Sequence, residues 1–182
     1  MRRFPTVLAR TLALVATAVA LAIGAFELAV VQPALAKMRP ILASALPSER
    51  NAPVALAQVL DRTEPELVKY HLARNLLATP PSQIEGIGTT RRQFTELTLG
   101  LALQAHLSAQ EQSALFLSQA YMGPGIKGFG QAAQAYLGVP LEQVTRSQAA
   151  RLVAISQAPS LYLASPERLA RRTELILASE RQ

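Results

Sequence analysis

Residues 121–138 read YMGPGIKGFGQAAQAYLG, and residues 141–172 read LEQVTRSQAARLVAISQAPSLYLASPERLARR. Four glycines and a proline lie within residues 122–130. This composition predicts a loop with backbone dihedrals that other residues rarely adopt, or a loop that another group approaches closely. It matches neither a Walker A motif nor a dinucleotide fingerprint, because no strand is predicted before it. By its pattern alone it is a tight turn between helices.

The residues after this loop predict helices with recognisable ends. A short Ala-rich helix is expected over residues 131–136. Thr145-x-x-Gln148 is a capping box that opens a helix through Ile155. Ser165-Pro166-Glu167 combines an N-cap, a proline at the first helical position and an acid in the first turn, which opens a last helix to about Ser179.

Apolar residues recur at helical spacing upstream as well, and period-2 alternation is scarce. Helices are expected over 53–62, from Glu64 to the residues before Pro80, and from Thr89 or Thr90 onward. Ser108-x-x-Glu111 is a capping box for a further helix that carries Leu115, Leu117 and Tyr121. The predicted fold class is therefore all-α.

The N-terminus carries a membrane signal. Arg2, Arg3 and Arg10 precede the stretch from Thr11 to Val31, in which Glu27 is the one charged residue. The stretch is long enough for a membrane-spanning helix, which needs about 20 residues, and the preceding arginines place the N-terminus inside. Ala34-Leu35-Ala36 leaves a second interpretation open, a cleaved signal peptide.

The resulting division is an anchor or uncleaved signal over residues 1–36, a linker over 37–51 and a helical domain over 52–182. Under either interpretation the helical domain lies outside the cytoplasm. We expect a single-pass protein of the inner (cytoplasmic) membrane, with its body on the periplasmic or extracytoplasmic side.

Composition excludes several classes of site. The chain of 182 residues has no Cys and two His, which rules out thiolate chemistry and leaves little for a His-rich metal site. The net charge of +6 favours an anionic partner, and membrane lipid is the expected one. Aromatic residues make up 5% and Trp is absent, which is poor material for stacking bases. No nucleic-acid partner is expected.

Carboxylates remain as the chemically active groups. Glu96 follows Arg92 at the i, i+4 spacing, and Arg91 lies one residue further back. Two guanidiniums can hold a pyrophosphate while a carboxylate positions a proton or a metal ion. The same pattern also fits an ordinary salt bridge within a helix, so the spacing alone leaves both interpretations open.

The stretch from Tyr121 to Arg172 resembles the C-terminal half of the family 51 glycosyltransferase domain, found in class A penicillin-binding proteins and monofunctional transglycosylases. The family shows a Tyr-Phe-Gly-x-Gly turn, an Ala-rich helix, Tyr-Phe-Gly, Pro-Gln-Ala-Pro-Ser-x-Tyr and a late Arg-Arg. The residues in step here are Tyr121, Gly123, Gly125, Gly128, Ala132, Ala133, Tyr136, Gly138, Gln157, Ala158, Pro159, Ser160, Tyr162, Pro166, Arg171 and Arg172. The resemblance implies a lysozyme-like helical domain.

Upstream, the family's motifs are partly lost. Residues 72–77 (LARNLL) resemble the segment that follows the family's Gly-Gly-Ser-Thr-Ile-Thr-Gln-Gln motif, but Tyr70 and His71 replace the two glutamines. The Arg-Lys-x-x-Glu motif corresponds to Arg92 through Glu96, with Gln93 in place of Lys. In the next motif, Lys-x-x-Ile-x-x-x-Tyr-x-Asn, the Lys, Tyr and Asn are all changed; it falls on Ala109, Gln112, Phe116 and Ser118.

The family's first motif, Glu-Asp-x-x-Phe-x-x-His-x-Gly, is not found. In the family its Glu is the general base that takes the proton from the acceptor sugar's 4-hydroxyl, which attacks the donor and expels lipid pyrophosphate. Residues 47–66 contain carboxylates but no such pattern. The domain is thus predicted to be truncated relative to the family.

The resemblance makes Glu96 the candidate catalytic residue and Arg91, Arg92, Arg171 and Arg172 candidate substrate-binding residues, with no protein metal ligand assigned. For Arg171 and Arg172 a solvated helix face is the ordinary alternative. A divalent cation, Mg²⁺ or Mn²⁺, is the cofactor that the family allows. The implied partners are lipid-linked disaccharide pyrophosphate, glycan strands and other cell-wall enzymes.

These features leave several functions open. The first is a peptidoglycan glycosyltransferase-like protein with impaired or absent polymerase activity. The second is an active polymerase in which Asp61, Glu64 or Glu66 replaces the missing base. A lysozyme-like hydrolase using Glu96 and a non-catalytic helical scaffold that binds cell-wall enzymes are the others. A polymerase needs a carboxylate that faces Glu96 across a cleft.

Overall fold

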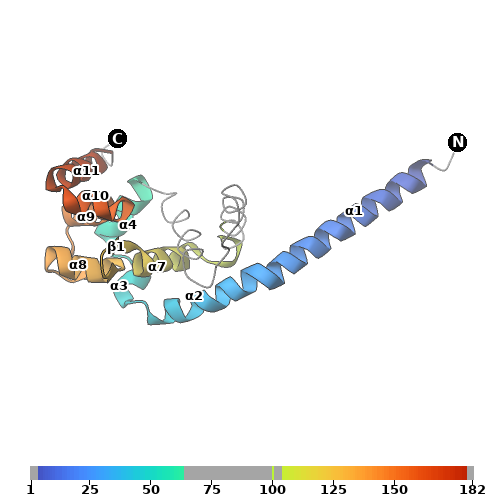
Figure 1. The fold of residues 1–182 in the computed structure, drawn as a ribbon, viewed down its shortest axis with the longest axis horizontal. Coiled ribbons are helices and arrows are strands. Elements are labelled where there is room, and N and C mark those ends of the chain that lie inside the picture. The colour runs from blue at the N-terminus through green and yellow to red at the C-terminus, as the bar shows by residue number, and fades with distance from the viewer. Residues whose placement is uncertain (1–3, 64–99, 101–103, 180–182) are drawn as a thin grey trace. The chain divides into compact units, whose positions relative to one another are not determined.

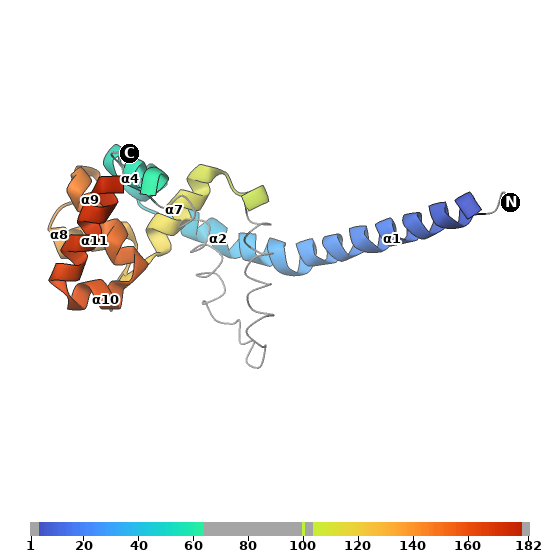
Figure 2. The same ribbon diagram turned by 90° about the horizontal axis from the view of Figure 1, so that it is seen from above.

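The N-terminal apolar run forms a long helix in the computed structural model, which describes residues 4–63, 100 and 104–179. The chain divides into two units, Met1–Lys37 and Met38–Gln182. Most described residues are helical, and the predicted all-α class is confirmed. Figure 1 shows the order of the elements, and Figure 2 shows the same ribbon turned by 90°.

Helix α1 runs over Phe4–Phe26 and continues through a π-helical turn, Glu27–Val31, into α2, Gln32–Ser44. Pro33 has no N–H, so it cannot donate to the carbonyl four residues back, and the wider turn before it absorbs this loss. The Gln32 N–H bonds Glu27 O, five residues earlier, and the Gln32 side-chain amide donates to Glu27 Oε1 at 2.7 Å.

The helix over Arg10–Ser44 is long and apolar enough to cross a membrane, with a mean hydropathy of 2.3 in its most apolar window. Many of its large apolar side chains are exposed: Leu12, Leu14, Val15, Val19, Leu21, Ile23 and Leu28. Residues 37–44, the first part of the predicted linker, continue this helix.

Two short helices follow. Helix α3 covers Pro47–Arg50, and α4 covers Val54–Thr63, where a helix over 53–62 was predicted. Leu56 and Val59 of α4 are fully buried. The helices predicted from Glu64 and from Thr89 or Thr90 lie outside the described residues, apart from Gly100.

Helix α7 occupies Ala109–Gln119 and begins with the predicted capping box. The Ser108 side chain accepts from the Glu111 N–H, and the Glu111 carboxylate accepts from the Ser108 N–H at 2.8 Å. Leu115 and Leu117 are buried, as the helical spacing predicts. The assignment of Tyr121 to this helix is wrong: the helix ends at Gln119, and Tyr121 opens a strand.

Strands β1 (Tyr121–Gly123) and β2 (Ile126–Lys127) form an antiparallel hairpin. Helix α8 then covers Phe129–Leu137 and ends at Gly138, whose φ of 69° is left-handed. The Ala-rich helix was predicted two residues later, at Gln131. Its early start follows from the hairpin, which ends one residue before Gly128.

The last three helices are α9 (Arg146–Gln157), α10 (Pro159–Ala164) and α11 (Pro166–Ser179). The capping box of α9 and the bounds of α11 agree with the sequence prediction, whereas α10 was not predicted. Helix α10 is only six residues long, too short for a periodic apolar pattern to stand out.

Helix α9 is the centre of the core, because α4, α8, α10 and α11 all pack against it. In both views, α9, α10 and α11 lie together (Figures 1 and 2). The α9 side chains that are buried come from nearly every face of the helix: Ala149, Ala150, Leu152, Val153, Ala154, Ile155 and Ser156. A helix enclosed in this way fixes the helices that carry the family-like residues.

Candidate functional site

The glycine-rich loop is a tight hairpin. Gly123, Gly125 and Gly128 have φ values of 136°, 73° and 84°, all in the region that favours glycine. These angles let β1 reverse into β2 and then enter α8. The special dihedrals predicted from the sequence are confirmed.

Tyr136 of α8 holds the hairpin against the domain. Its hydroxyl donates to the Met122 carbonyl at 2.9 Å. A Cβ at Gly123 would lie 2.5 Å from that hydroxyl and 2.7 Å from Leu163 Cδ1, so a larger residue would displace these side chains, and the φ of 136° also favours glycine. Partial burial, with the nearby Tyr121 as a smaller cause, raises the pKa of Tyr136 above its ordinary value of 10.0. The hydroxyl therefore stays a hydrogen-bond donor at neutral pH.

A buried carboxylate, Glu49, lies beneath the end of this loop and is 6% exposed. Its Oε2 accepts from the Leu46 N–H at 3.1 Å, and its Oε1 accepts from the Gly130 N–H at 3.2 Å. Gly130 is in the first turn of α8, so Glu49 satisfies a helix-start N–H that the helix itself leaves unpaired. The carboxylate thus ties α3 to α8.

The glycines facing Glu49 leave room for its carboxylate. A Cβ at Gly128 would lie 2.9 Å from Glu49 Oε1, and one at Gly130 would lie 3.1 Å from the same atom. The sequence analysis did not single out Glu49. Its local signal is Pro47 at the first position of a helix with an acid in the first turn, which marks a helix start and no distant partner.

Ser48, beside Glu49, is also buried and connects α3 to the segment after α8. Its hydrogen bond is the main cause that lowers the pKa of the exposed Glu142 below its ordinary value of 4.5. The short helix α3 is therefore fixed from two sides, by the start of α8 and by Glu142.

The two late arginines differ in their surroundings. Arg171 is exposed on α11, whereas Arg172 is half-buried and its Nε donates to Gln157 Oε1 at 2.8 Å. This bond joins α11 to the last residue of α9. The Nε of Arg172 thus has a structural partner, and the substrate-binding roles predicted for both arginines stay predictions.

Three of the predicted site residues, Arg91, Arg92 and Glu96, lie outside the described residues, as do Glu64 and Glu66. Asp61 is described and is exposed near the end of α4. The prediction that a carboxylate faces Glu96 across a cleft therefore also concerns residues outside the described part of the chain. Among the described residues, the structure brings Glu49 to the end of the glycine-rich loop and, separately, Arg172 to Gln157.

The sequence model described as transglycosylase matches residues 68–180, more than half of the chain. The chain belongs to the transglycosylase family. The resemblance drawn from residues 121–172 is thereby confirmed, together with the lysozyme-like helical fold of this domain. In this member of the family, the glycines of the family pattern form the β1–β2 hairpin, and Gln157 to Ser160 join α9 to α10.

Relatives of known description cover only part of the chain. It is 34% identical over 91 residues to penicillin-binding protein 1A from Neisseria gonorrhoeae, which is 49% of this chain and 11% of that protein. It is 30% identical over 112 residues to penicillin-binding protein 1A from Aquifex aeolicus, 60% of this chain and 15% of that protein. A protein described as a transglycosylase from Cupriavidus necator is 33% identical over 91 residues, with coverage of 49% and 39%.

The chain thus spans a small part of the penicillin-binding proteins that it matches and well under half of the Cupriavidus protein. Family membership applies to the matched helical domain.

The part of the chain that the structure describes contains no set of ligands for the divalent cation that the family allows. There, no three acidic or histidine side chains come together. His106 is exposed. No residue is therefore assigned to a cation, and no chemical step is derived through one.

Proposed function

We propose that this protein is a membrane-anchored, peptidoglycan glycosyltransferase-like protein of cell-wall glycan assembly, with impaired or absent polymerase activity. The family match over residues 68–180 carries the first half of this proposal. The substrate class follows from the family: glycan strands or a lipid-linked disaccharide pyrophosphate.

The impairment is inferred from carboxylate placement. A general base must have a free oxygen within hydrogen-bond reach of the proton that it removes. Before the family match begins, Glu49 is the buried carboxylate of the described residues, and each of its oxygens already accepts a backbone N–H. This favours a structural role for Glu49 over a role as general base. It therefore supports the proposal that the missing first motif impairs catalysis.

An active polymerase with a relocated base is the second candidate. The observation in its favour is Asp61, an exposed carboxylate near the end of α4. Loss of general-base catalysis costs about 10²–10⁴ in rate, so a relocated base would be measurable against that background.

Anchoring is proposed from the apolar helix over Arg10–Ser44. Arg2, Arg3 and Arg10 precede its apolar stretch, and positive residues stay on the cytoplasmic side, so the domain lies on the extracytoplasmic side. Membrane fractionation with alkaline carbonate tests the anchor. Protease digestion of intact spheroplasts tests the side, because only an outward domain is cleaved.

The decisive experiment is polymerisation of lipid-linked disaccharide pyrophosphate by the full-length protein with Mg²⁺ or Mn²⁺ present. We expect binding of the substrate without glycan chains. Chains that disappear in Glu96→Gln and persist in Glu167→Gln, an exposed carboxylate of α11, would instead establish the relocated-base polymerase. Absence of both binding and product would overturn the proposal and leave a scaffold for other wall proteins.

A further inference from the structure

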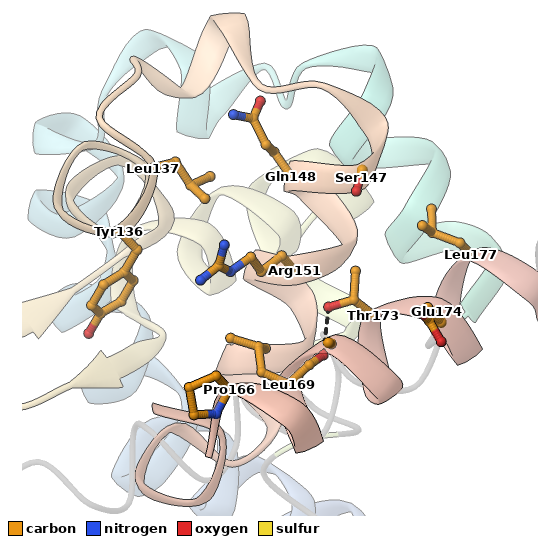
Figure 3. Close-up of a pocket in the computed structure, with 11 residues that line it drawn as sticks. Tyr136, Leu137, Ser147, Gln148, Arg151, Pro166, Leu169, Thr173, Glu174 and Leu177 are labelled. Atoms are coloured by element: carbon orange, nitrogen blue, oxygen red, sulfur yellow. Dashed lines mark hydrogen bonds between the residues drawn. The ribbon is translucent and has the colours of Figure 1, made fainter. Parts of the chain in front are cut away.

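A second site lies away from the hairpin, in a pocket of about 620 Å³ between α8, α9 and α11 (Figure 3). Sites for small ligands usually measure about 300–1,000 Å³. Leu137, Leu169 and Leu177 contribute apolar surface to its lining. The walls are fixed by the core, since α8 and α11 both pack against α9.

Two opposite charges line this pocket without neutralising each other. Arg151 comes from α9 and Glu174 from α11. Within the described part of the chain, neither side chain makes a hydrogen bond or ion pair. Figure 3 shows Arg151 directed toward Tyr136 and Leu137, and Glu174 on the side of Thr173 and Leu177. The pocket therefore offers one positive and one negative side chain, both exposed, from two different helices, beside apolar lining residues.

Neighbouring polar groups divide into those already used and those that can meet a ligand. The Thr173 hydroxyl donates to Leu169 O at 2.8 Å, and the Tyr136 hydroxyl donates to Met122 O. The Gln148 carbonyl oxygen accepts from the Thr145 N–H, which leaves its NH₂ group as a donor. The polar donors of α9 that remain for a ligand are thus the Arg151 guanidinium, the Gln148 amide and the Ser147 hydroxyl.

We propose that this pocket binds a short zwitterionic peptide. Its carboxylate pairs with Arg151, its ammonium pairs with Glu174, and its aliphatic side chains contact Leu137, Leu169 and Leu177. A guanidinium is well suited to a carboxylate because its N–H groups match the two oxygens. A simple anion such as phosphate is disfavoured, because Glu174 would repel it. This site is independent of the proposed glycan chemistry.

The test measures binding of Leu-Leu to the full-length protein by isothermal titration calorimetry, beside N-acetyl-Leu-Leu and Leu-Leu-amide. Each capped probe lacks one of the two charges. We expect the free dipeptide to bind about tenfold more tightly than either capped form, because hydrogen bonds to charged groups are the strong ones.

Two substitutions test which side chain of the protein recognises each charged end of the peptide. Arg151→Gln removes the preference over the amide, and Glu174→Gln removes the preference over the acetylated form. Arg168→Gln and Glu167→Gln, exposed positions of α11 outside the pocket lining, leave both preferences unchanged. Circular dichroism and thermal unfolding confirm that each variant is folded.

Equal binding of free and capped dipeptides would overturn the proposal, as would no binding to folded wild-type protein. Inorganic phosphate that competes through Arg151 alone would also overturn it, in favour of a simple anion site. Peptide binding is measured without any glycan substrate, so its failure is distinct from failure of the polymerisation assay.

Discussion

Helices α1 and α9 are both rich in apolar side chains, yet they bury them differently. Leu14 and Leu21 of α1 are 71% and 70% exposed, whereas Leu152 and Val153 of α9 are fully buried. Apolar surface left in water costs free energy in proportion to its area. The comparison teaches that α9 has its apolar partners inside the domain, whereas the apolar side chains of α1 lack such partners among the described residues, and the proposed partner is a bilayer.

The largest expected effect separates these two helices directly. Leu152→Ala leaves a cavity in the core and should lower the free energy of unfolding by about 2–5 kcal/mol. Leu21→Ala, the same change in α1, should leave the unfolding of the helical domain unchanged. Urea denaturation followed by circular dichroism measures both. Similar losses in the two variants would show that α1 belongs to the same cooperative unit as α9.

A charge in α1 tests the proposed bilayer partner. Leu21→Arg places a cation near the middle of the apolar stretch, which costs about 2.5–3.5 kcal/mol for membrane insertion. The carbonate-resistant fraction should fall, while Leu21→Ile should behave as wild type. Full retention of the Arg variant in membranes would argue against a spanning helix.

Substitutions of glycine by alanine compare how tightly the backbone is packed in the helical domain and in α1. Gly128 has a φ of 84°, and an added Cβ would meet Glu49 Oε1 and the Ser118 carbonyl, both at 2.9 Å. Gly128→Ala should therefore cost about 1–3 kcal/mol in thermal or urea unfolding. Gly24→Ala in α1 meets nothing within 4 Å and should not destabilise the domain. A neutral Gly128→Ala would mean that Glu49 can move aside and that the hairpin is not held by it.

The N-cap of α9 should contribute less to the free energy of unfolding than the buried side chains of α9 do. The Thr145 side chain accepts from the Gln148 N–H at 3.3 Å. Thr145→Ala should lower the free energy of unfolding by about 1 kcal/mol, and Thr145→Ser should restore most of it. No recovery in the Ser variant would assign the effect to the lost methyl group instead of the cap.

The smallest effect concerns pH. Hydrogen bonds from Ser108 lower the pKa of Glu111 below its ordinary value of 4.5. A lowered folded-state pKa gives stability that is present above the unfolded value and lost as pH falls through the folded value. Melting temperatures between about pH 6 and about pH 3 should therefore fall less in Glu111→Gln than in wild type. Identical acid sensitivity would show that the capping box carries no net charge effect.

The sequence by itself determined the features that depend on neighbours within one helical turn. The apolar run from Thr11 to Val31, the caps at Ser108 and Thr145, and the proline start of α11 are all recognisable locally. The glycine-rich loop was predictable for the same reason, because positive φ is a property of single residues. The family pattern over residues 121–172 was recognised from the order of its glycines, prolines and tyrosines along the chain.

Only the tertiary structure decided which distant groups meet. Glu49 and Gly130 are 81 residues apart, and Arg172 reaches back to Gln157 from another helix. Tyr121 was predicted in a helix, but pairing with Lys127 makes it a strand. The two charged side chains of the α8–α9–α11 pocket likewise come from separate helices. Such contacts depend on how whole helices pack around α9, and no local spacing in the sequence specifies that arrangement.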